Sequence, residues 1–369
     1  MRSVQHSASS GHSMPTLPAI TYRPMASGPL AWIVSSNDNE VWGSPEAGTR
    51  KGSGMENVIE VQGLAKSFGH REALRGIDFE IPRGSVFGVI GPNGAGKTTA
   101  MRCLLDIIRP TAGQVRVLGT DPRRAGPAIR RRIGYLPGEL ALERRITGRR
   151  MMAHFAAISG PVAPGRIEEL ASRLGLELDR QSRKLSKGNK QKLGLVQAFM
   201  HDPELLILDE PTSGLDPLMQ REFLGMVEDA RGRGQTLFLS SHMIGEIEQA
   251  ADRVAILRDG LIVRTATVEE LRAGARRRLR VVAATDPETL AGALEPLPGL
   301  ELLDTKRLGE GAGALEARFA GEVGALLHAL AGVEVLDLVL EEPDLEEAVL
   351  ELYGSPPGNG RHRAGEPRP

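Results

Sequence analysis

The 369-residue sequence has one cysteine, few aromatic residues (4%) and almost no net charge, with 46 Lys and Arg against 47 Asp and Glu. The lone Cys103 excludes a disulfide framework, so we expect a reducing, cytosolic compartment. No run of about 18 apolar residues occurs, so the sequence predicts no membrane-spanning helix. The net charge of −1 argues against a generally basic nucleic-acid-binding protein. At about 150 residues per domain, the length predicts two or three domains.

The neutral total hides an asymmetry along the chain. Residues 1–120 carry 12 basic and 9 acidic side chains, whereas residues 121–200 carry 17 and 7. Residues 201–369 carry 17 basic and 31 acidic side chains. Two interpretations of the basic segment stand: a solvated surface, or a face that meets a partner or ligand of opposite charge.

Composition and periodicity divide the chain into four parts. Residues 1–54 are rich in Ser, Gly and Pro without a sustained period, so we expect a disordered N-terminal extension. Periodic sequence begins at Met55. We expect either that translation starts at this residue or that the preceding extension is dispensable. We expect a first domain over residues 55–270, with an Arg-rich helical subdomain at about 139–185. A second domain over 271–354 and a disordered tail over 355–369 follow.

Short apolar segments predict the fold of the first domain. Alternating residues at 58–61 and 77–81 predict strands, as do the buried-type runs 86–90, 205–208 and 236–240. A helix is expected over Thr98–Ile108, where Arg109 and Pro110 stop it. Strands that alternate with helices imply an α/β fold with a mainly parallel sheet covered on both faces.

The second domain has a different order of elements. Strand patterns over 279–284, 300–308, 314–320 and 333–340 are separated by helical patterns over 287–297 and 322–331. This β-α-β-β-α-β order is that of ferredoxin-like α+β folds. A last helix is expected over Asp344–Tyr353.

The segment Gly91–Thr99 matches the phosphate-binding pattern G-x-x-x-x-G-K-[ST] between a predicted strand and a predicted helix. Its glycines let backbone N–H groups turn toward phosphate oxygens, and the helix start adds a positive dipole end. Lys97 would reach the β- and γ-phosphates, and the Thr98 hydroxyl would hold Mg²⁺. The predicted nucleotide-binding residues here are Gly91, Asn93, Gly94, Ala95, Gly96, Lys97, Thr98 and Thr99.

The apolar run Leu205–Leu208 ends in Asp209 and Glu210. Ligands bind at the carboxyl ends of parallel strands, where these two side chains emerge. Asp209 is predicted to bind Mg²⁺ directly or through water, and Glu210 to polarise the attacking water as a general base. Taken alone, such a pair also fits a strand-end cap, but the phosphate-binding segment favours the functional interpretation.

With these segments, residues 57–270 resemble the nucleotide-binding subunit of an ATP-binding-cassette (ABC) transporter. Three further segments carry the resemblance: the signature loop Leu185–Asn189, the D-loop Ser213–Asp216, and His242, which is similar to the family's switch histidine. Phe68 looks like the aromatic residue that stacks on adenine, with a place in the core as the alternative. The alternative interpretation of His242 is that it is a capping residue after a buried strand.

The resemblance implies that two such domains pair head to tail around two ATP molecules. Ser186 and Gly188 would then contact the nucleotide that a second copy of the chain holds, and Asp216 of the D-loop is also predicted to bind nucleotide. Glu210 and His242, the residues that matter most for turnover, match the family pattern, so an active ATPase that uses ATP and Mg²⁺ is expected.

Two departures from the family pattern stand out. In the signature loop, Lys187 stands where the family usually has glycine, and Asn189 where it usually has glutamine. The charged Lys187 side chain either faces phosphate or is simply solvated. The family's Q-loop glutamine is missing near residues 135–139, where Gly138 holds its place. Glu139 beside it is a candidate sensor of Mg²⁺ or of the attacking water.

The expected function is therefore the energy-coupling subunit of a bacterial exporter of the ABC-2 type, a branch that includes drug and antibiotic export. The partners would be a separate membrane permease and a second copy of the chain, at the cytoplasmic face of the plasma membrane. The permease would dock on the basic region 139–185. Nucleic acid is not expected as a partner, although the basic segment leaves a soluble ABC ATPase acting on ribosomes or DNA as an alternative. An importer subunit is a further alternative.

Overall fold

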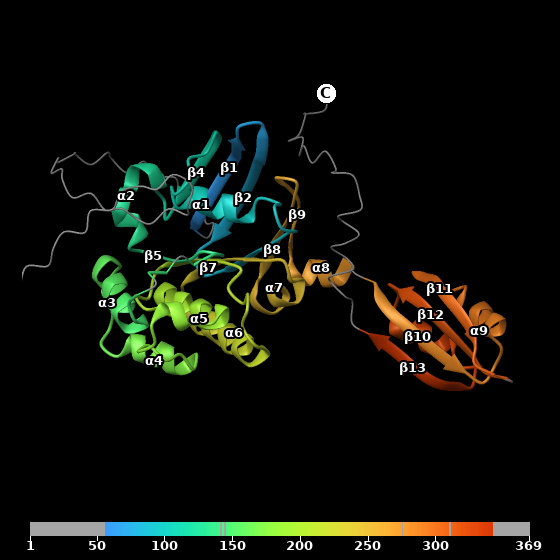
Figure 1. The fold of residues 1–369 in the computed structure, drawn as a ribbon. Coiled ribbons are helices and arrows are strands. Elements are labelled where there is room, and N and C mark those ends of the chain that lie inside the picture. The colour runs from blue at the N-terminus through green and yellow to red at the C-terminus, as the bar shows by residue number, and fades with distance from the viewer. Residues whose placement is uncertain (1–55, 141, 144, 275, 310, 342–369) are drawn as a thin grey trace, which may run out of the picture. The chain divides into compact units, whose positions relative to one another are not determined.

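A computed structural model of the chain describes residues 56–140, 142–143, 145–274, 276–309 and 311–341. Within these residues the strands form three sheets (Figure 1). The predicted extension (1–54), the last helix (344–353) and the tail (355–369) lie outside the described residues. In the part of the chain described, no helix combines the length and apolar character needed to cross a membrane.

A six-stranded sheet with the order β5-β6-β7-β3-β8-β9 forms the centre of the first part of the chain (Figure 1). All neighbouring pairs are parallel except β8 and β9. This arrangement confirms the predicted α/β fold with a mainly parallel sheet. The strands are β3 (Val86–Ile90), β5 (Ile133–Leu136), β6 (Leu205–Asp209), β7 (Thr236–Ser241), β8 (Arg253–Arg258) and β9 (Leu261–Thr267).

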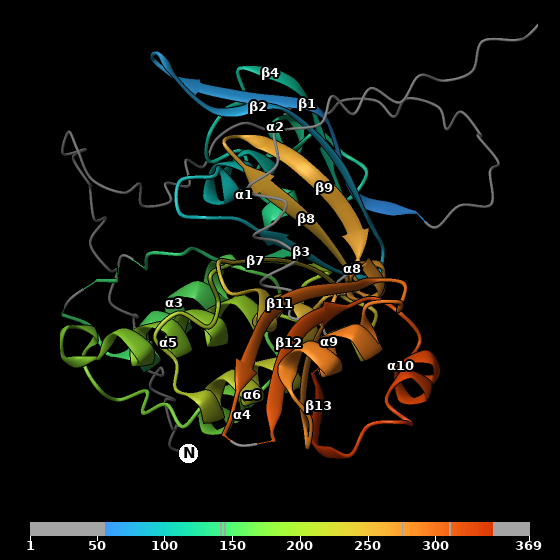
Figure 2. The same ribbon diagram turned by 90° about the vertical axis from the view of Figure 1, so that its right-hand side faces the viewer.

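A three-stranded antiparallel sheet of order β2-β1-β4 packs near α1, and both views place its strands side by side (Figures 1 and 2). The strands are β1 (Asn57–Phe68), β2 (Arg71–Pro82) and β4 (Ala112–Val117). The predicted alternation at 58–61 and 77–81 falls inside the first two. The sequence did not predict β4.

The helices of the first part differ from the expectation at one place. They are α1 (Lys97–Leu104), α2 (Pro122–Arg130), α3 (Gly148–Ile158), α4 (Arg166–Arg173), α5 (Lys187–Phe199), α6 (Pro217–Gly232), α7 (Ile244–Ala250) and α8 (Val268–Gly274), with a 3₁₀ turn at Ser182–Lys184. The helix predicted over 98–108 ends at Leu104, because Asp106 adopts a left-handed φ of 53° that an α-helix cannot continue.

Successive residues of the central strands point to opposite faces of the sheet, and each face has its own core. One core contains residues from α3 to α7; its strand residues include Val86, Leu206, Leu208, Leu237 and Leu239. The other contains residues from α1 and from the three-stranded sheet; its strand residues include Phe87, Val89, Leu205, Ile207 and Phe238. The sheet is therefore buried on both faces, which holds the ends of its strands in fixed positions.

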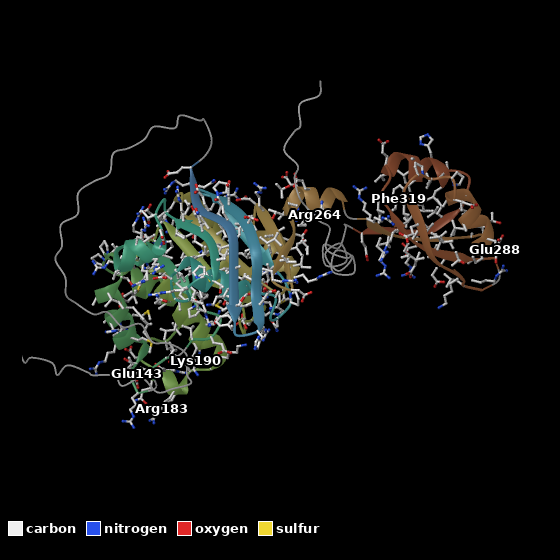
Figure 3. All side chains as sticks on the ribbon, turned by 90° about the horizontal axis from the view of Figure 1, so that it is seen from above. Glu143, Arg183, Lys190, Arg264, Glu288 and Phe319 are labelled. Carbon is white, nitrogen blue, oxygen red and sulfur yellow. The ribbon has the colours of Figure 1, made fainter. Side chains whose placement is uncertain are left out.

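The C-terminal part forms a four-stranded antiparallel sheet with the order β11-β12-β10-β13. Its elements confirm the predicted ferredoxin-like order: β10 (Arg277–Ala283), α9 (Pro287–Leu294), β11 (Leu300–Arg307), β12 (Gly313–Phe319), α10 (Val323–Ala329) and β13 (Val335–Glu341). This part has its own core, in which Phe319 is fully buried (Figure 3). The domain boundaries predicted at residues 54/55, 270/271 and 354/355 stay predictions.

The packing predicts a large effect for one core substitution. Phe238 is 1% exposed, and its ring centroid lies 5.7 Å from that of Phe79 and 6.1 Å from that of Phe87. Phe238→Ala is expected to lower the free energy of unfolding by about 3–5 kcal/mol, because it leaves a cavity among these rings. Urea unfolding measures the change, with the 68% exposed Leu218 replaced by alanine as the control. A loss below about 1 kcal/mol for Phe238→Ala would contradict this packing.

Candidate active site

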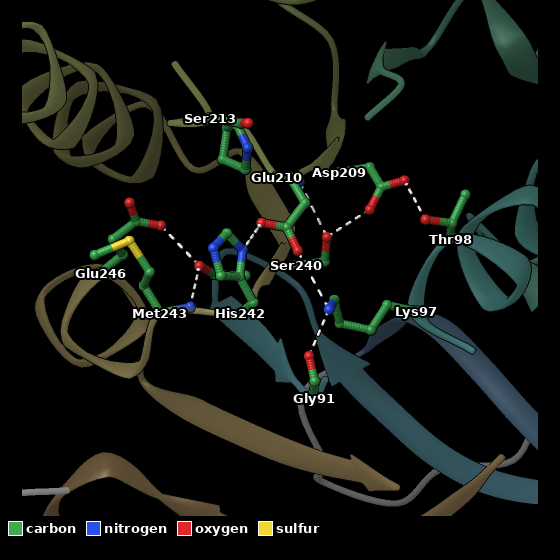
Figure 4. Close-up of polar contacts among 12 residues, drawn as sticks. Gly91, Lys97, Thr98, Asp209, Glu210, Ser213, Ser240, His242, Met243 and Glu246 are labelled. Atoms are coloured by element: carbon green, nitrogen blue, oxygen red, sulfur yellow. Dashed lines mark hydrogen bonds and ion pairs between the residues drawn. The ribbon is translucent and has the colours of Figure 1, made fainter. Parts of the chain in front are cut away.

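Three neighbouring strands of the central sheet end at the same edge, and the predicted phosphate-binding and acidic residues meet there (Figure 4). β3 leads into Gly91, β6 ends at Asp209, and β7 ends at Ser241, one residue before His242. The parallel pairing of these strands brings their carboxyl ends together, although Thr98 and Asp209 are 111 positions apart in sequence.

The phosphate loop (Gly91–Gly96) is shaped by glycines that no other residue replaces easily. Gly94 and Gly96 have φ values of 86° and 116°, which disfavour any residue with a Cβ. A Cβ at Gly91 would lie 2.4 Å from the carbonyl oxygen of Leu257. The loop therefore keeps its backbone close to the sheet, and Gly96 begins α1 at Lys97.

Lys97 is buried, with 6% of its surface exposed, and its ammonium has two partners. Nζ donates to the carbonyl of Gly91 at 2.5 Å and lies 3.2 Å from Oε1 of Glu210 (Figure 4). The side chain thus spans the mouth of the phosphate loop, where it places a positive charge beside the glutamate that ends the acidic pair.

Asp209 is a fully buried carboxylate held by two hydroxyl groups. Thr98 Oγ1 donates to Oδ2 at 2.6 Å, and Ser240 Oγ donates to Oδ1 at 2.6 Å. Both carboxylate oxygens are therefore satisfied, which a buried charge requires. The sequence placed Thr98 and Asp209 in the site, and the structure adds Ser240 as the residue that connects β7 to them.

Glu210 follows with a strained backbone and a side chain directed into the site. Its φ is 51°, an uncommon value for a residue other than glycine. Its N–H donates to Ser240 Oγ at 3.0 Å, and its Oε2 lies 2.5 Å from Nδ1 of His242 (Figure 4). The half-exposed His242 therefore contacts the predicted general base directly, which favours its functional interpretation over that of a cap.

The signature loop begins α5, with the Ser186 hydroxyl as the helix cap that accepts from the Asn189 N–H at 3.2 Å. Gly188 approaches the D-loop so closely that a Cβ would lie 2.5 Å from the Gly214 carbonyl oxygen. Lys187 Nζ donates to Ser213 Oγ at 3.0 Å. The Lys187 side chain is exposed, as its interpretation as a solvated residue expects, and its ammonium also pairs with the D-loop.

Within the described residues, no hydrogen bond or ion pair joins Ser186 or Gly188 to the phosphate loop of the same chain. Asp216 caps α6 instead, accepting from the Met219 N–H at 3.0 Å. In the part of the chain that the structure describes, a hydrogen bond joins the signature loop to the D-loop, and none joins either of them to the phosphate loop.

Two other predicted residues lie at the margins of the site. Phe68 is 48% exposed at the end of β1, with Lys66 Nζ 4.9 Å from its ring centroid, so it is not a core residue. A hollow of about 510 Å³ beside it includes Gly94 of the phosphate loop in its lining. Glu139 is exposed, whereas a Cβ at Gly138 would lie 3.1 Å from Oδ2 of Asp209. Gly138 therefore lies beside Asp209, and both its match to the missing glutamine and the role of Glu139 stay predictions.

Cys103 takes no part in the site. It is 2% exposed on α1, and burial raises the pKa of its thiol to about 11, well above its ordinary value. Cys103 is therefore a small buried side chain of α1.

A further contact beside the site was not predicted from the sequence. Gln191, on α5, is 4% exposed and donates from Nε2 to the carbonyl oxygens of Glu210 and Pro211, at 2.9 and 3.0 Å. No local motif marks it, because its partners lie 19 and 20 positions away.

The parallel sheet, the glycine-rich loop before α1 and the acidic pair after β6 define a P-loop nucleotide-binding domain. A family model for ABC transporters matches residues 74–213. Over 308 residues the chain is 36% identical to the daunorubicin resistance ATP-binding protein DrrA3 of Streptomyces coeruleorubidus, covering 81% of this chain and 96% of that protein. Over 305 residues it is 32% identical to the bacitracin transport ATP-binding protein BcrA of Bacillus licheniformis, covering 81% and 98%.

Solved structures agree with this assignment. A structure of an ATP-binding subunit of an ABC transporter has a TM-score of 0.55 at 28% identity, covering 58% of this chain and 92% of that chain. The dimeric, post-hydrolysis cassette MJ0796 bound to ADP and Pi shares the fold, with a TM-score of 0.52 at 20% identity over 57% and 98% of the chains. The chain belongs to the ABC transporter family: it is an ATP-binding subunit of that family and an ATPase.

The close approach of the two loops predicts the effect of one added methyl group. Gly188→Ala places a Cβ against the Gly214 carbonyl, so the signature loop must shift, and we expect ATP hydrolysis to fall about tenfold or more. Binding of nucleotide to the phosphate loop of the same chain is expected to stay unchanged. Steady-state hydrolysis and equilibrium nucleotide binding measure the two effects. Gly232→Ala, at a position with nothing within 4 Å, is the control, and equal rates for the two variants would contradict the prediction.

Proposed function

We propose that the chain powers export by binding and hydrolysing ATP at the edge formed by β3, β6 and β7. The observation that carries the proposal is the convergence of Lys97, Thr98, Asp209 and Glu210 at that edge. The backbone N–H groups of residues 91–99 and the Lys97 ammonium would hold the phosphates. The exposed ring of Phe68 beside the hollow would stack on the adenine.

Glu210 would act as the general base for the attacking water. Its Oε2 contacts His242, just after β7, and its Oε1 lies near Lys97 of α1, so both oxygens are oriented by neighbours from different elements. A base held in this way loses little freedom when water and phosphate arrive. His242 is half exposed at the same edge, where its ring nitrogen can respond to the γ-phosphate.

The oxygen donors of Thr98 and Asp209 fit Mg²⁺, which prefers a carboxylate, a hydroxyl and water in an octahedral arrangement. The two side chains already lie 2.6 Å apart, at Thr98 Oγ1 and Asp209 Oδ2. Bound there, the ion would neutralise charge on the β- and γ-phosphates. Gly138 packs against this carboxylate, because a Cβ there would lie only 3.1 Å from Oδ2 of Asp209.

A second copy of the chain would complete each site. Ser186 and Gly188 present the N-terminus of α5, which favours anions, but among the described residues no hydrogen bond joins them to the phosphate loop of their own chain. A head-to-tail pair would place them on the phosphates held by the partner, with Asp216 at the same interface. The dimeric cassette with the same fold supports this arrangement. ATP would then join the two chains, and hydrolysis would release them.

The exporter assignment rests on the relatives. DrrA3 is named for daunorubicin resistance, and a Mycobacterium tuberculosis relative, 37% identical over 232 residues, is named for fluoroquinolone export. The permease of an ABC-2 type exporter would be a separate chain at the cytoplasmic face of the plasma membrane, docked on the basic helical region. Arg183 projects from this region (Figure 3). Other arginines there are neutralised, as Arg149 is by Glu168 and Asp179, which weakens the case for a nucleic-acid partner.

The catalytic assignment predicts a trapped state. Glu210→Gln keeps the shape of the side chain but removes the base, so the variant is expected to bind ATP and Mg²⁺ and to accumulate as an ATP-bound dimer. Size-exclusion chromatography with ATP measures the dimer, with ADP as the control nucleotide. A variant that hydrolyses ATP at the wild-type rate and stays monomeric would remove Glu210 from its role.

The exporter assignment predicts where the chain is found. The tagged full chain, expressed in its own host, is expected in the membrane fraction with an integral membrane protein of several spans in a fixed ratio. Quantitative mass spectrometry of the purified complex measures that ratio. The ATPase rate of the complex is expected to rise with a transported drug. Recovery with ribosomes or DNA, and without a membrane protein, would favour the alternative instead.

A further inference from the structure

Gln191 joins the signature helix α5 to the backbone of the glutamate at the end of β6. Its side-chain amide is almost completely buried and donates to two successive carbonyls, those of Glu210 at 2.9 Å and Pro211 at 3.0 Å. Among the described residues, no other donor reaches the Pro211 carbonyl. One nitrogen therefore fixes the orientation of two consecutive peptide groups.

The backbone that Gln191 holds is one that the chain would not adopt unaided. Glu210 has a φ of 51°, and the residue before a proline is further restricted to extended conformations. Such a conformation persists only when its surroundings determine it from several sides. Ser240 binds the Glu210 N–H from β7, the Ser213 N–H reaches the Glu210 carbonyl at 3.2 Å, and Gln191 holds it from α5.

We propose that Gln191 is a positioning residue for hydrolysis, which sets the direction of the Glu210 side chain by fixing the backbone that follows it. The inference rests on the proposed role of Glu210 as the general base. Because Gln191 lies on the helix that begins with the signature loop, this contact also connects that loop to the catalytic glutamate of the same chain. Lys187 and Gly188, which contact Ser213 and Gly214, extend the connection along the same segment.

The test replaces the amide without changing the size of the side chain much. Gln191→Met removes both donated hydrogen bonds, and we expect kcat for ATP to fall about tenfold to a hundredfold. KM and ATP affinity are expected to stay within about twofold, because no phosphate contact is lost. Gln235→Met is the matched control: Gln235 is also buried and donates from Nε2 to the Pro203 carbonyl, and both residues precede the amino ends of β7 and β6, opposite the site. This control is expected to lose stability but keep kcat per folded chain.

A second variant distinguishes the loss of the hydrogen bonds from a loss of folding. Gln191→Asn keeps a buried amide but shortens its reach by one methylene, so it is expected to lower kcat as well, with KM unchanged. The proposal is overturned if both variants, at equal folded fraction by thermal unfolding, keep the wild-type kcat. It is also overturned if kcat falls no further than in Gln235→Met.

A double variant separates this inference from the proposed function. If Gln191 acts through Glu210, then adding Gln191→Met to Glu210→Gln lowers the residual hydrolysis no further. An additional loss similar to that in the wild-type background overturns the proposal. If Glu210→Gln alone hydrolyses ATP normally, the role of Glu210 fails and the inference fails with it. If Glu210→Gln is inactive while Gln191→Met is fully active, only the positioning role fails.

Discussion

The buried carboxylate of Asp209 is the constraint on which the site depends. A charge with no exposed surface is tolerated only with hydrogen-bond partners, and Asp209 has one on each oxygen, from Thr98 and from Ser240. These bonds fix the first turn of α1 and the end of β7 against β6. Lys97, next to Thr98, is thereby directed at Glu210, next to Asp209. The buried carboxylate of Asp209 thus positions the consecutive residues Lys97 and Thr98 against the consecutive residues Asp209 and Glu210.

The rest of the fold supplies rigidity at that edge. The central strands are covered on both faces, by one core that includes α3 to α7 and another that includes α1 and the three-stranded sheet. Residues at the ends of such strands keep their geometry before any ligand arrives, which is what electrostatic stabilisation of a developing charge requires. The strained φ of Glu210 is held by contacts from β7 and α5, so the site is determined by several elements together.

The sequence predicted the elements whose signal is local. The buried runs at 86–90, 205–208 and 236–240 became β3, β6 and β7, since each is a short apolar run next to a polar motif. The strands β4, β5, β8 and β9 were not predicted. Ile133–Leu136 has only four residues and follows arginines, and Arg253–Arg258 is flanked by charged residues. Neither segment therefore shows a clear apolar pattern of the kind that predicts a strand.

The residues of the candidate site also divide into those with a local sequence signal and those without one. The phosphate loop and the acidic pair could be found from residue type and spacing, and the structure brings them together. The roles of Gln191 and Ser240 and the contact of Lys187 with Ser213 could not be found in this way. Each depends on a hydrogen bond between segments 19 to 31 residues apart, which only the packing of α5 and β7 determines. The alternatives for Lys187 considered phosphate and solvent, because sequence alone does not show that the D-loop lies beside it.

The central claim is that each ATP site combines the phosphate loop of one chain with the signature loop of another. Complementation between two inactive variants tests it most directly: Lys97→Ala lacks the phosphate-binding ammonium, and Ser186→Asp keeps a good helix cap but repels phosphate. Each variant alone is expected to be inactive. Their equimolar mixture is expected to recover up to about a quarter of the wild-type hydrolysis rate, since half of the dimers are mixed and each mixed dimer has one intact site. A mixture that hydrolyses ATP no faster than the average of the two separate variants would contradict the account.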